Sequence, residues 1–188
     1  MQVTRRSMAW RLICAACWLF AGAMPIALAG DNVEDVNLLK TAFIYKFSLF
    51  THWPENTLNE KGAPLLLCVA GEDDLADALG QIKGKIIKGH PLGIQAIKDV
   101  QAPRNCHILF IAASEKKNLP SLIKAVSGQP VLTISELPRF ASAGGIFELY
   151  RENGRIRFII NLGAARKAGL EISPNLLNLA TVIGTEPQ

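Results

Sequence analysis

The order of apolar and polar positions predicts strands and helices that succeed one another along the chain. Continuous apolar runs of strand length occupy residues 64–70, 106–112 and 130–134. Such runs are typical of strands that are covered on both faces, as in a parallel sheet. Residues 86–97 contain two glycines and a proline between their apolar positions, so they predict a more marginal strand.

Helical spacing appears between these runs. Residues 31–50 predict a long first helix with a broad apolar surface, formed by Val36, Leu39, Phe43, Tyr45, Phe47 and Phe50. Pro54 ends this segment, because proline disfavours helical backbone in the residue before it. Shorter helices are predicted at residues 75–79, between Ser114 and Gly128, at residues 164–168, and from Ser173 to Ile183.

The strongest local signal is a hairpin near the C-terminus. Two β-rich runs, residues 146–150 and 155–160, flank the pair Asn153-Gly154. An Asn-Gly pair suits a type I′ turn, because both central residues of that turn need a positive φ. Alternation places Arg155 and Arg157 on one face of the second strand.

Strands that alternate with helices predict an α/β fold with a mostly parallel central sheet flanked by helices, and with the C-terminal antiparallel β-hairpin as an extension. Residues 30–188 contain no long linker, repeat or low-complexity tract, which favours a single domain.

Residues 1–29 are predicted to be a cleaved signal peptide. Three arginines precede an apolar run from Leu12 to Phe20, and Ala27-Leu28-Ala29 supplies a small-residue cleavage site. A retained membrane anchor is the weaker alternative, because the apolar stretch is short and Pro25 interrupts it. Removing the leader lowers the formal net charge from +4 to +1, since it takes away three arginines and no acidic residue. A nearly neutral chain gives no electrostatic reason to expect nucleic acid as a partner.

Cleavage of the leader determines which cysteines are available to form a disulfide. Cys14 and Cys17 leave with it, and Cys68 and Cys106 remain. An even pair in an oxidising compartment predicts a disulfide, with two free buried thiols as the weaker alternative. Closing this loop is expected to stabilise the fold by about 3–4 kcal/mol in the chain-entropy account.

No arrangement of residues predicts a catalytic centre, a cofactor site or a metal site. The glycine-containing stretch at residues 80–85 is one residue too short for a phosphate loop. His52, His90 and His107 are isolated from one another and show no ligand spacing. Glu148 lies in an apolar strand and is either a buried acid or an outward-facing residue, and alternation favours the outward position.

Basic residues gather around the hairpin and the helix that follows it: Arg139, Arg151, Arg155, Arg157, Arg166 and Lys167. An ordinary solvated face accounts for such charge equally well, since protein surfaces are normally charged. The functional interpretation is a docking patch for an acidic partner surface.

Five stretches, taken in order, carry a family resemblance: residues 39–54 (LKTAFIYKF to WP), 67–71 (LCVAG), 106–111 (CHILFI), 130–135 (PVLTIS) and 144–177 (GGI to LL). Together they resemble the YfiR family of periplasmic proteins, formerly a domain of unknown function. The resemblance covers nearly the whole chain after the leader.

The resemblance implies an α/β periplasmic protein without known catalysis. The best-described members repress an inner-membrane diguanylate cyclase by binding its periplasmic sensor region. An outer-membrane lipoprotein sequesters the repressor, which releases cyclic-di-GMP synthesis and promotes biofilm formation. Those members form dimers and carry disulfides, one of which corresponds to Cys68–Cys106. A second family bridge has no counterpart, because residues 140–188 contain no cysteine.

The leading hypothesis is therefore a periplasmic, homodimeric repressor of a diguanylate cyclase, with an outer-membrane lipoprotein as a further partner. We expect the partner to contact the hairpin face at Arg155 and Arg157, and the following helix at Arg166, Lys167 and Leu170.

The alternative is a small-ligand-sensing or solute-binding periplasmic domain that acts with a sensor kinase or a transporter. Its pocket is expected near Gly71 and Ser114, where the carboxyl ends of parallel strands meet.

Overall fold

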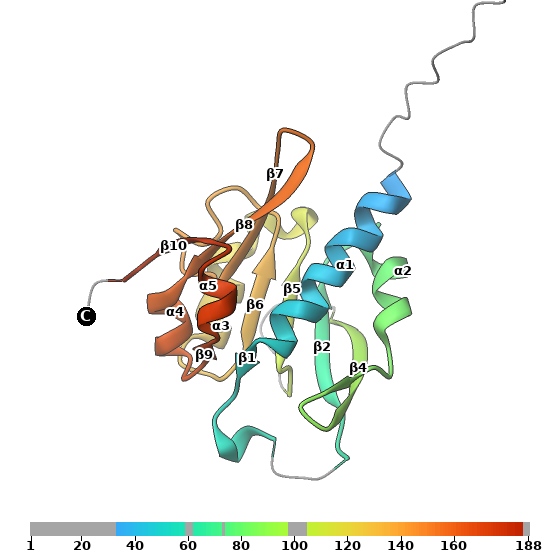
Figure 1. Ribbon diagram of the computed structural model, residues 1–188, viewed down its shortest axis with the longest axis vertical. Coiled ribbons are helices and arrows are strands. Elements are labelled where there is room, and N and C mark those ends of the chain that lie inside the picture. Colours follow the sequence, from blue (N-terminus) through green and yellow to red (C-terminus); the bar gives the residue numbers. More distant parts are fainter. Residues whose placement is uncertain (1–32, 59–61, 73, 98–104, 186–188) are drawn as a thin grey trace, which may run out of the picture. The chain divides into compact units, whose positions relative to one another are not determined.

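An eight-stranded β-sheet runs through the protein (Figure 1). The computed structural model describes residues 33–58, 62–72, 74–97 and 105–185, and the predicted signal peptide lies outside these ranges. The strand order across the sheet is β10-β8-β7-β6-β5-β2-β4-β3. The strands are β2 (Leu65–Ala70), β3 (Ile86–Ile87), β4 (His90–Ile97), β5 (Ile108–Ile111), β6 (Leu132–Ser135), β7 (Phe147–Glu152), β8 (Arg155–Asn161) and β10 (Thr181–Ile183).

The sheet is mixed. Neighbouring strands are parallel from β4 through β2, β5 and β6 to β7, and β10 is parallel to β8. The pairs β7–β8 and β3–β4 are antiparallel, because tight turns at Asn153-Gly154 and Lys88-Gly89, all with positive φ, reverse the chain. The prediction of a mostly parallel sheet is therefore wrong for the sheet as a whole, although the central strands are parallel.

The pair β7–β8 lies inside the sheet and does not extend it, since β10 pairs with the outer edge of β8. The predicted last helix is also too long. Helix α5 covers only Pro174–Leu177, and the chain then forms β10. Thr181, Val182 and Ile183 are all β-branched, which favours a strand over a helix.

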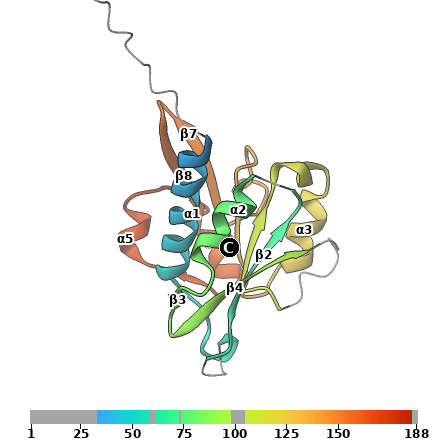
Figure 2. The ribbon, with the colours of Figure 1, turned by 90° about the vertical axis from the view of Figure 1, so that its right-hand side faces the viewer.

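Helices cover both faces of the sheet (Figures 1 and 2). Helices α1 (Val33–Leu49) and α2 (Leu75–Leu79) lie on one face, and α3 (Leu119–Val126) lies on the other. Within the ranges given above, no helix combines the length and hydropathy that are needed to cross a membrane.

The remaining elements are short. Helix α4 (Leu162–Lys167) follows β8 directly. The strands β1 (Thr51–His52) and β9 (Glu171–Ile172) pair in antiparallel fashion. This pair ties the end of α1 to the segment after α4. Three 3-10 turns complete the described chain: η1 (Glu55–Thr57), η2 (Gly80–Ile82) and η3 (Ala113–Lys117).

Side chains of the central strands alternate between two cores. Leu65, Leu67 and Val69 of β2 belong to the core that includes residues of α1 and α2. Cys68 and Ala70 of the same strand belong to the core beneath α3. The continuous apolar run thus reflects burial on both faces.

Helix α1 turns most of its predicted apolar surface toward the core: Phe47 is buried, and Phe43, Tyr45 and Phe50 are partly buried against it. Leu39 is the exception, because it is 49% exposed. The buried positions of α1 are Asn37, Thr41, Ile44, Phe47 and Ser48. The C-terminal half of α1 therefore buries large apolar side chains, whereas its N-terminal half buries Asn37 and Thr41 and leaves Leu39 exposed.

A disulfide joins Cys68 of β2 to Cys106, which lies just before β5. The two Cα atoms are 5.8 Å apart, and both residues are buried. The bridge therefore links two neighbouring strands of the sheet. This confirms the disulfide predicted from the cysteine pair.

Candidate functional site

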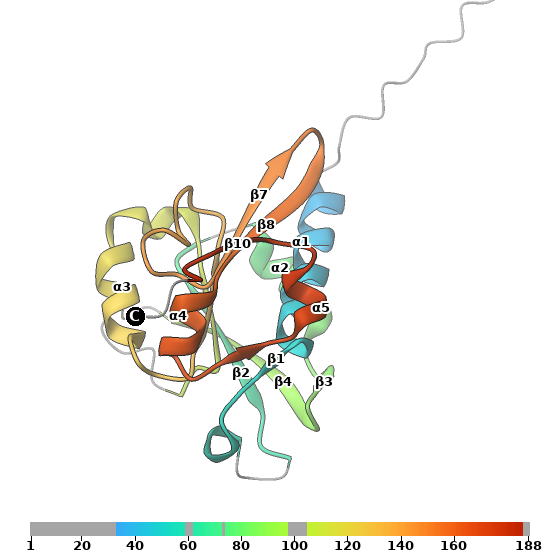
Figure 3. The ribbon, with the colours of Figure 1, turned by 60° about the vertical axis from the view of Figure 1, so that its left-hand side comes forward.

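The base of the β7–β8 hairpin is fixed against α1 by aromatic rings. Phe47 stacks on Phe147 with ring centroids 4.3 Å apart, and the rings of Phe43 and Phe158 are 5.9 Å apart. Aromatic pairs of this kind contribute about 0.5–1.5 kcal/mol each beyond the area they bury. The hairpin consequently stands beside α1 (Figures 2 and 3).

The far end of the hairpin is exposed and basic. We call residues 151–157 the hairpin tip, and it carries three arginines and one glutamate. Nε of Arg157 lies 3.8 Å from Oε2 of Glu152, and both side chains are more than half exposed. An exposed pair with this geometry contributes little to stability and leaves the charges open to a partner.

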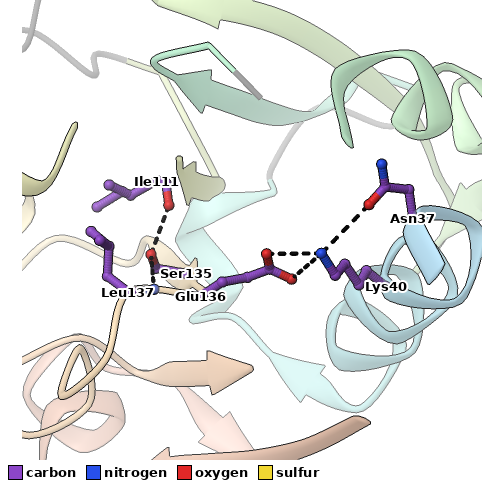
Figure 4. Close-up of polar contacts among 6 residues, drawn as sticks. All are labelled: Asn37, Lys40, Ile111, Ser135, Glu136 and Leu137. Atoms are coloured by element: carbon purple, nitrogen blue, oxygen red, sulfur yellow. Dashed lines mark hydrogen bonds and ion pairs between the residues drawn. The ribbon is translucent and has the colours of Figure 1, made fainter. Parts of the chain in front are cut away.

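An ion pair joins α1 to the end of β6 (Figure 4). Nζ of Lys40 lies 2.9 Å from each carboxylate oxygen of Glu136, and 3.5 Å from Oδ1 of Asn37. The two charged side chains are only 17% and 27% exposed. Their charges are therefore largely matched to each other.

The position of Glu136 is set by the residue before it (Figure 4). The hydroxyl of Ser135 donates a hydrogen bond of 2.7 Å to the carbonyl of Ile111 and accepts one of 3.1 Å from the backbone N–H of Leu137. Ser135 is fully buried, so both bonds are shielded from water. This turn holds Glu136 toward α1.

A groove of about 310 Å³ lies between these elements. Lys40 and Glu136 line one side of it, and Leu149, Tyr150 and Ile156 of the hairpin line the other. Its surface is mainly apolar, and its charged lining residues are Lys40, Glu136 and Arg151. The groove is of a size to take a single large side chain from a partner.

Two large apolar residues of α1 are exposed. Leu39 is 49% exposed, and Val33 is 64% exposed. Leu39 lies one helical turn before Phe43, whose ring contacts Phe158 of the hairpin. We define the docking surface as the hairpin tip, the groove and these two side chains.

The residues predicted to contact a partner lie in separate places in the structure and differ in exposure. Arg155 and Arg157 are exposed at the hairpin tip. Arg166 and Lys167 are exposed at the end of α4, away from the tip (Figures 1 and 3). Leu170 is only 1% exposed and belongs to the core. Leu170 is therefore unavailable for partner contact in this conformation.

Glu148 is buried, contrary to the outward position that alternation favoured. Its two carboxyl oxygens accept hydrogen bonds of 3.0 Å from the backbone N–H groups of Arg139 and Ala141. The loop between β6 and β7 folds over this strand face and covers the side chain. Glu148 therefore has a structural role in anchoring that loop.

The expected pocket near Gly71 and Ser114 is filled by the protein itself. Oγ of Ser114 accepts a hydrogen bond of 3.0 Å from the N–H of Glu72 and donates to its carbonyl at 3.2 Å. A Cβ added at Gly71 would lie 2.7 Å from Cγ of Glu115. The close packing of η3 against this strand end leaves no space for a ligand between them.

Two of the three histidines come together, although they are far apart in the sequence. His90 and His107 line a pocket of about 240 Å³ at the amino edge of the sheet. Nδ1 of His107 accepts a hydrogen bond of 3.0 Å from the N–H of Leu66, which requires this nitrogen to be unprotonated. Burial lowers the pKa of His107 from 6.5; a backbone hydrogen bond at Thr57 opposes the shift, and His90 adds to it.

Metal coordination has little support in the described part of the chain. There, no three side chains among His, Cys, Asp and Glu converge as ligands. Nδ1 of His90 instead lies 2.9 Å from the carbonyl of Ala63, and His52 lies beside Lys88. The histidines thus have local structural partners.

Comparison with known protein families agrees with this architecture. A family model described as YfiR/HmsC-like matches residues 37–181. The match spans α1, the disulfide-linked strands, the hairpin and α5, which is well over half of the chain. The chain therefore belongs to the YfiR/HmsC-like family.

Proposed function

We propose that this protein is a periplasmic regulator that binds the periplasmic sensor region of an inner-membrane diguanylate cyclase and represses the enzyme. Membership of the YfiR/HmsC-like family supports this role. In this proposal residues 1–29 direct export, and residues 30–188 act as a single non-catalytic domain. Cyclic-di-GMP and biofilm formation rise when the repression is lifted.

The observation that carries the proposal is the exposed charge of the hairpin tip. Three arginines and one glutamate stand beside the groove and the exposed apolar residues of α1. A surface with a basic end and an apolar groove fits a partner segment that combines acidic residues with one large apolar side chain. The partner is thus a protein surface and not a nucleic acid, since the chain as a whole is nearly neutral without its leader.

Repression follows from binding one conformation of the sensor region more tightly than the other. A partner of that kind shifts the cyclase toward its inactive state by its differential affinity alone. An outer-membrane lipoprotein that competes for the repressor would release the enzyme by mass action. The homodimer that the family resemblance implies would present two docking surfaces to a dimeric cyclase.

The double substitution Arg155→Glu/Arg157→Glu tests this surface. It reverses the charge of the hairpin tip without touching a buried group, so folding should be preserved while binding to an acidic partner is lost. In a strain that lacks the gene, the variant should leave intracellular cyclic-di-GMP as high as in the deletion. Lys116→Glu/Lys117→Glu, on exposed η3, is the matched control and should restore repression.

Repression by the hairpin variant at the wild-type level would contradict the assignment of this surface. A thermal melt of both variants shows whether each is folded, so that lost repression is attributed to binding and not to instability.

A further inference from the structure

The largest of the pockets that we describe lies far from the docking surface. It measures about 570 Å³ and is bounded by α3, by α4 and by the segment that leads into β7. Thr133 of β6, Ile146 before β7 and Asn161 at the end of β8 form its floor. It therefore lies at the amino ends of β6 and β7. Glu136 and the docking surface lie at the opposite, carboxyl ends of these two strands.

Aliphatic side chains form about half of the pocket lining, and polar groups, including Ser127, Asn161 and Lys167, form the rest. Ile123 and Val126 face it from α3, and Ala164 and Ala168 face it from α4 and its end. These side chains offer no hydrogen bonds and favour an apolar body of matching width. The volume falls within the range of roughly 300–1,000 Å³ that is usual for small-molecule sites.

Glycines fix one end of the pocket. A Cβ added at Gly163 would lie 3.1 Å from the carbonyl oxygen of Gly184, and a Cβ at Gly184 would lie 3.0 Å from N of Gly163. Gly184 also has a φ of 67°. The end of β10 can approach the start of α4 this closely only because both residues lack a side chain, so this wall is pre-formed.

The hydroxyl of Thr133, on the floor, can donate a hydrogen bond to a ligand. Thr133 is 3% exposed, and its Oγ1 accepts a hydrogen bond of 2.9 Å from the N–H of Ile146. Among the residues that the structure describes, no acceptor is placed for the hydroxyl hydrogen of Thr133. Thr133 Oγ1 thus has one partner already, and a bound molecule that supplies an oxygen can accept its hydrogen as a second bond.

The rim offers one positive charge. Lys167 is the sole charged residue that lines the pocket, and its side chain is exposed at the end of α4. No ion pair engages it within the described ranges. A single cation beside a partly aliphatic lining favours a ligand that carries one negative charge.

We infer that this pocket binds a small aliphatic carboxylic acid that bears a second oxygen, such as an oxo or hydroxy acid. The carboxylate meets Lys167 at the rim, the chain lies between α3 and α4, and the second oxygen accepts the hydroxyl hydrogen of Thr133. The site is separate from the docking surface, so the inference does not depend on the proposed partner.

Titration with 4-oxopentanoate, followed by amide NMR, tests this inference. We expect saturable shifts at Gly144, Gly163 and Gly184, which line the pocket. Pentan-2-one lacks the carboxylate and pentanoate lacks the second oxygen, so both should bind more weakly. Lys167→Met should weaken binding at least about fivefold. This figure already allows for the weakening of an exposed charge by the surrounding water.

Matched variants separate a binding role from a folding role. Lys167→Arg keeps the charge, and Lys124→Met removes an exposed lysine of α3 that does not line the pocket, so both should bind like the wild type. Thr133→Ser keeps the hydroxyl and should retain affinity, whereas Thr133→Val should lose it.

Three results would overturn the inference: no saturable shift at the three glycines, equal binding of pentan-2-one, or an unchanged affinity in Lys167→Met. The experiment leaves repression of a cyclase untouched, so its failure is distinguishable from failure of the proposed function.

Discussion

Single buried polar groups carry much of the specificity of this fold. Glu148 is 6% exposed, and it holds the loop between β6 and β7 through two backbone N–H groups. Buried Ser135 of β6 and half-buried His107, just before β5, likewise hydrogen-bond to the backbone of a neighbouring strand. Because buried donors are costly to leave unpaired, these side chains are hard to replace.

Glu148→Gln should lower the free energy of unfolding by about 1–3 kcal/mol, because its amide NH₂ would face a backbone N–H and leave that donor unpaired. Urea unfolding of the purified protein measures the loss. Glu152→Gln, at an exposed position on the same strand, is the control and should change stability little. Equal stability of the two variants would show that the loop does not depend on Glu148.

The lowered pKa of His107 predicts a loss of stability in mild acid. Above a pH of about 6.5 the imidazole is neutral in both states. As the pH falls below that value, the unfolded chain takes up a proton that the folded chain resists, so the unfolded state gains stability. The loss continues until the pH passes the lower pKa of the folded state.

His107→Asn tests this linkage, because Oδ1 of asparagine can accept the hydrogen bond from Leu66 without titrating. Its melting temperature should fall less between pH 7.5 and pH 5 than that of the wild type. His52→Asn removes an exposed imidazole and serves as the control. Identical pH profiles for the wild type and His107→Asn would rule out His107 as the titrating group.

At the scale of elements, the disulfide ties β2 to the start of β5 beneath α3. Both sulfur-bearing residues are buried, so a reductant reaches the bond only when the fold opens. The double variant Cys68→Ala/Cys106→Ala should lower the free energy of unfolding by about 3–4 kcal/mol. Dithiothreitol under native conditions should leave the bond intact, and rapid reduction without unfolding would instead indicate an accessible redox switch.

Elements with strong local signals were predictable from the sequence. Asn153-Gly154 forms a turn with two positive φ values, and the apolar runs at β2, β5 and β6 are buried strands. The buried face of α1 and the strand β10 were harder to predict, because their residues are compatible with more than one arrangement. The apolar residues of α1 predict an inward face, and Phe47 is indeed buried, but packing also buries Asn37 and Thr41 and leaves Leu39 exposed.

The candidate site was only partly predictable, because it depends on tertiary contacts. Arg155 and Arg157 are exposed as expected, whereas the groove needs Lys40 and Glu136, which are distant in sequence. From the sequence, Leu170 was predicted to contact a partner together with Lys167. Gly169 has a φ of 70°, however, and an apolar residue after such a glycine commonly packs back onto its helix.

At the scale of the whole molecule, the two ends of the central strands have different roles in this account. The docking surface combines charge and exposed apolar residues beside α1, and the larger pocket lies at the opposite strand ends under α3 and α4. A molecule built this way can bind a protein with one region and a small acid with another. Any coupling between the two would act through β6 and β7, which reach both.

Intracellular cyclic-di-GMP, measured after deletion and restoration of the gene, tests repression of a cyclase most directly. The account predicts that cyclic-di-GMP rises on deletion and returns to the wild-type level with the full-length gene. A version without residues 1–29 should fail to restore it, since it would remain outside the periplasm. Unchanged cyclic-di-GMP on deletion, or full restoration by the leaderless version, would contradict periplasmic repression of a diguanylate cyclase.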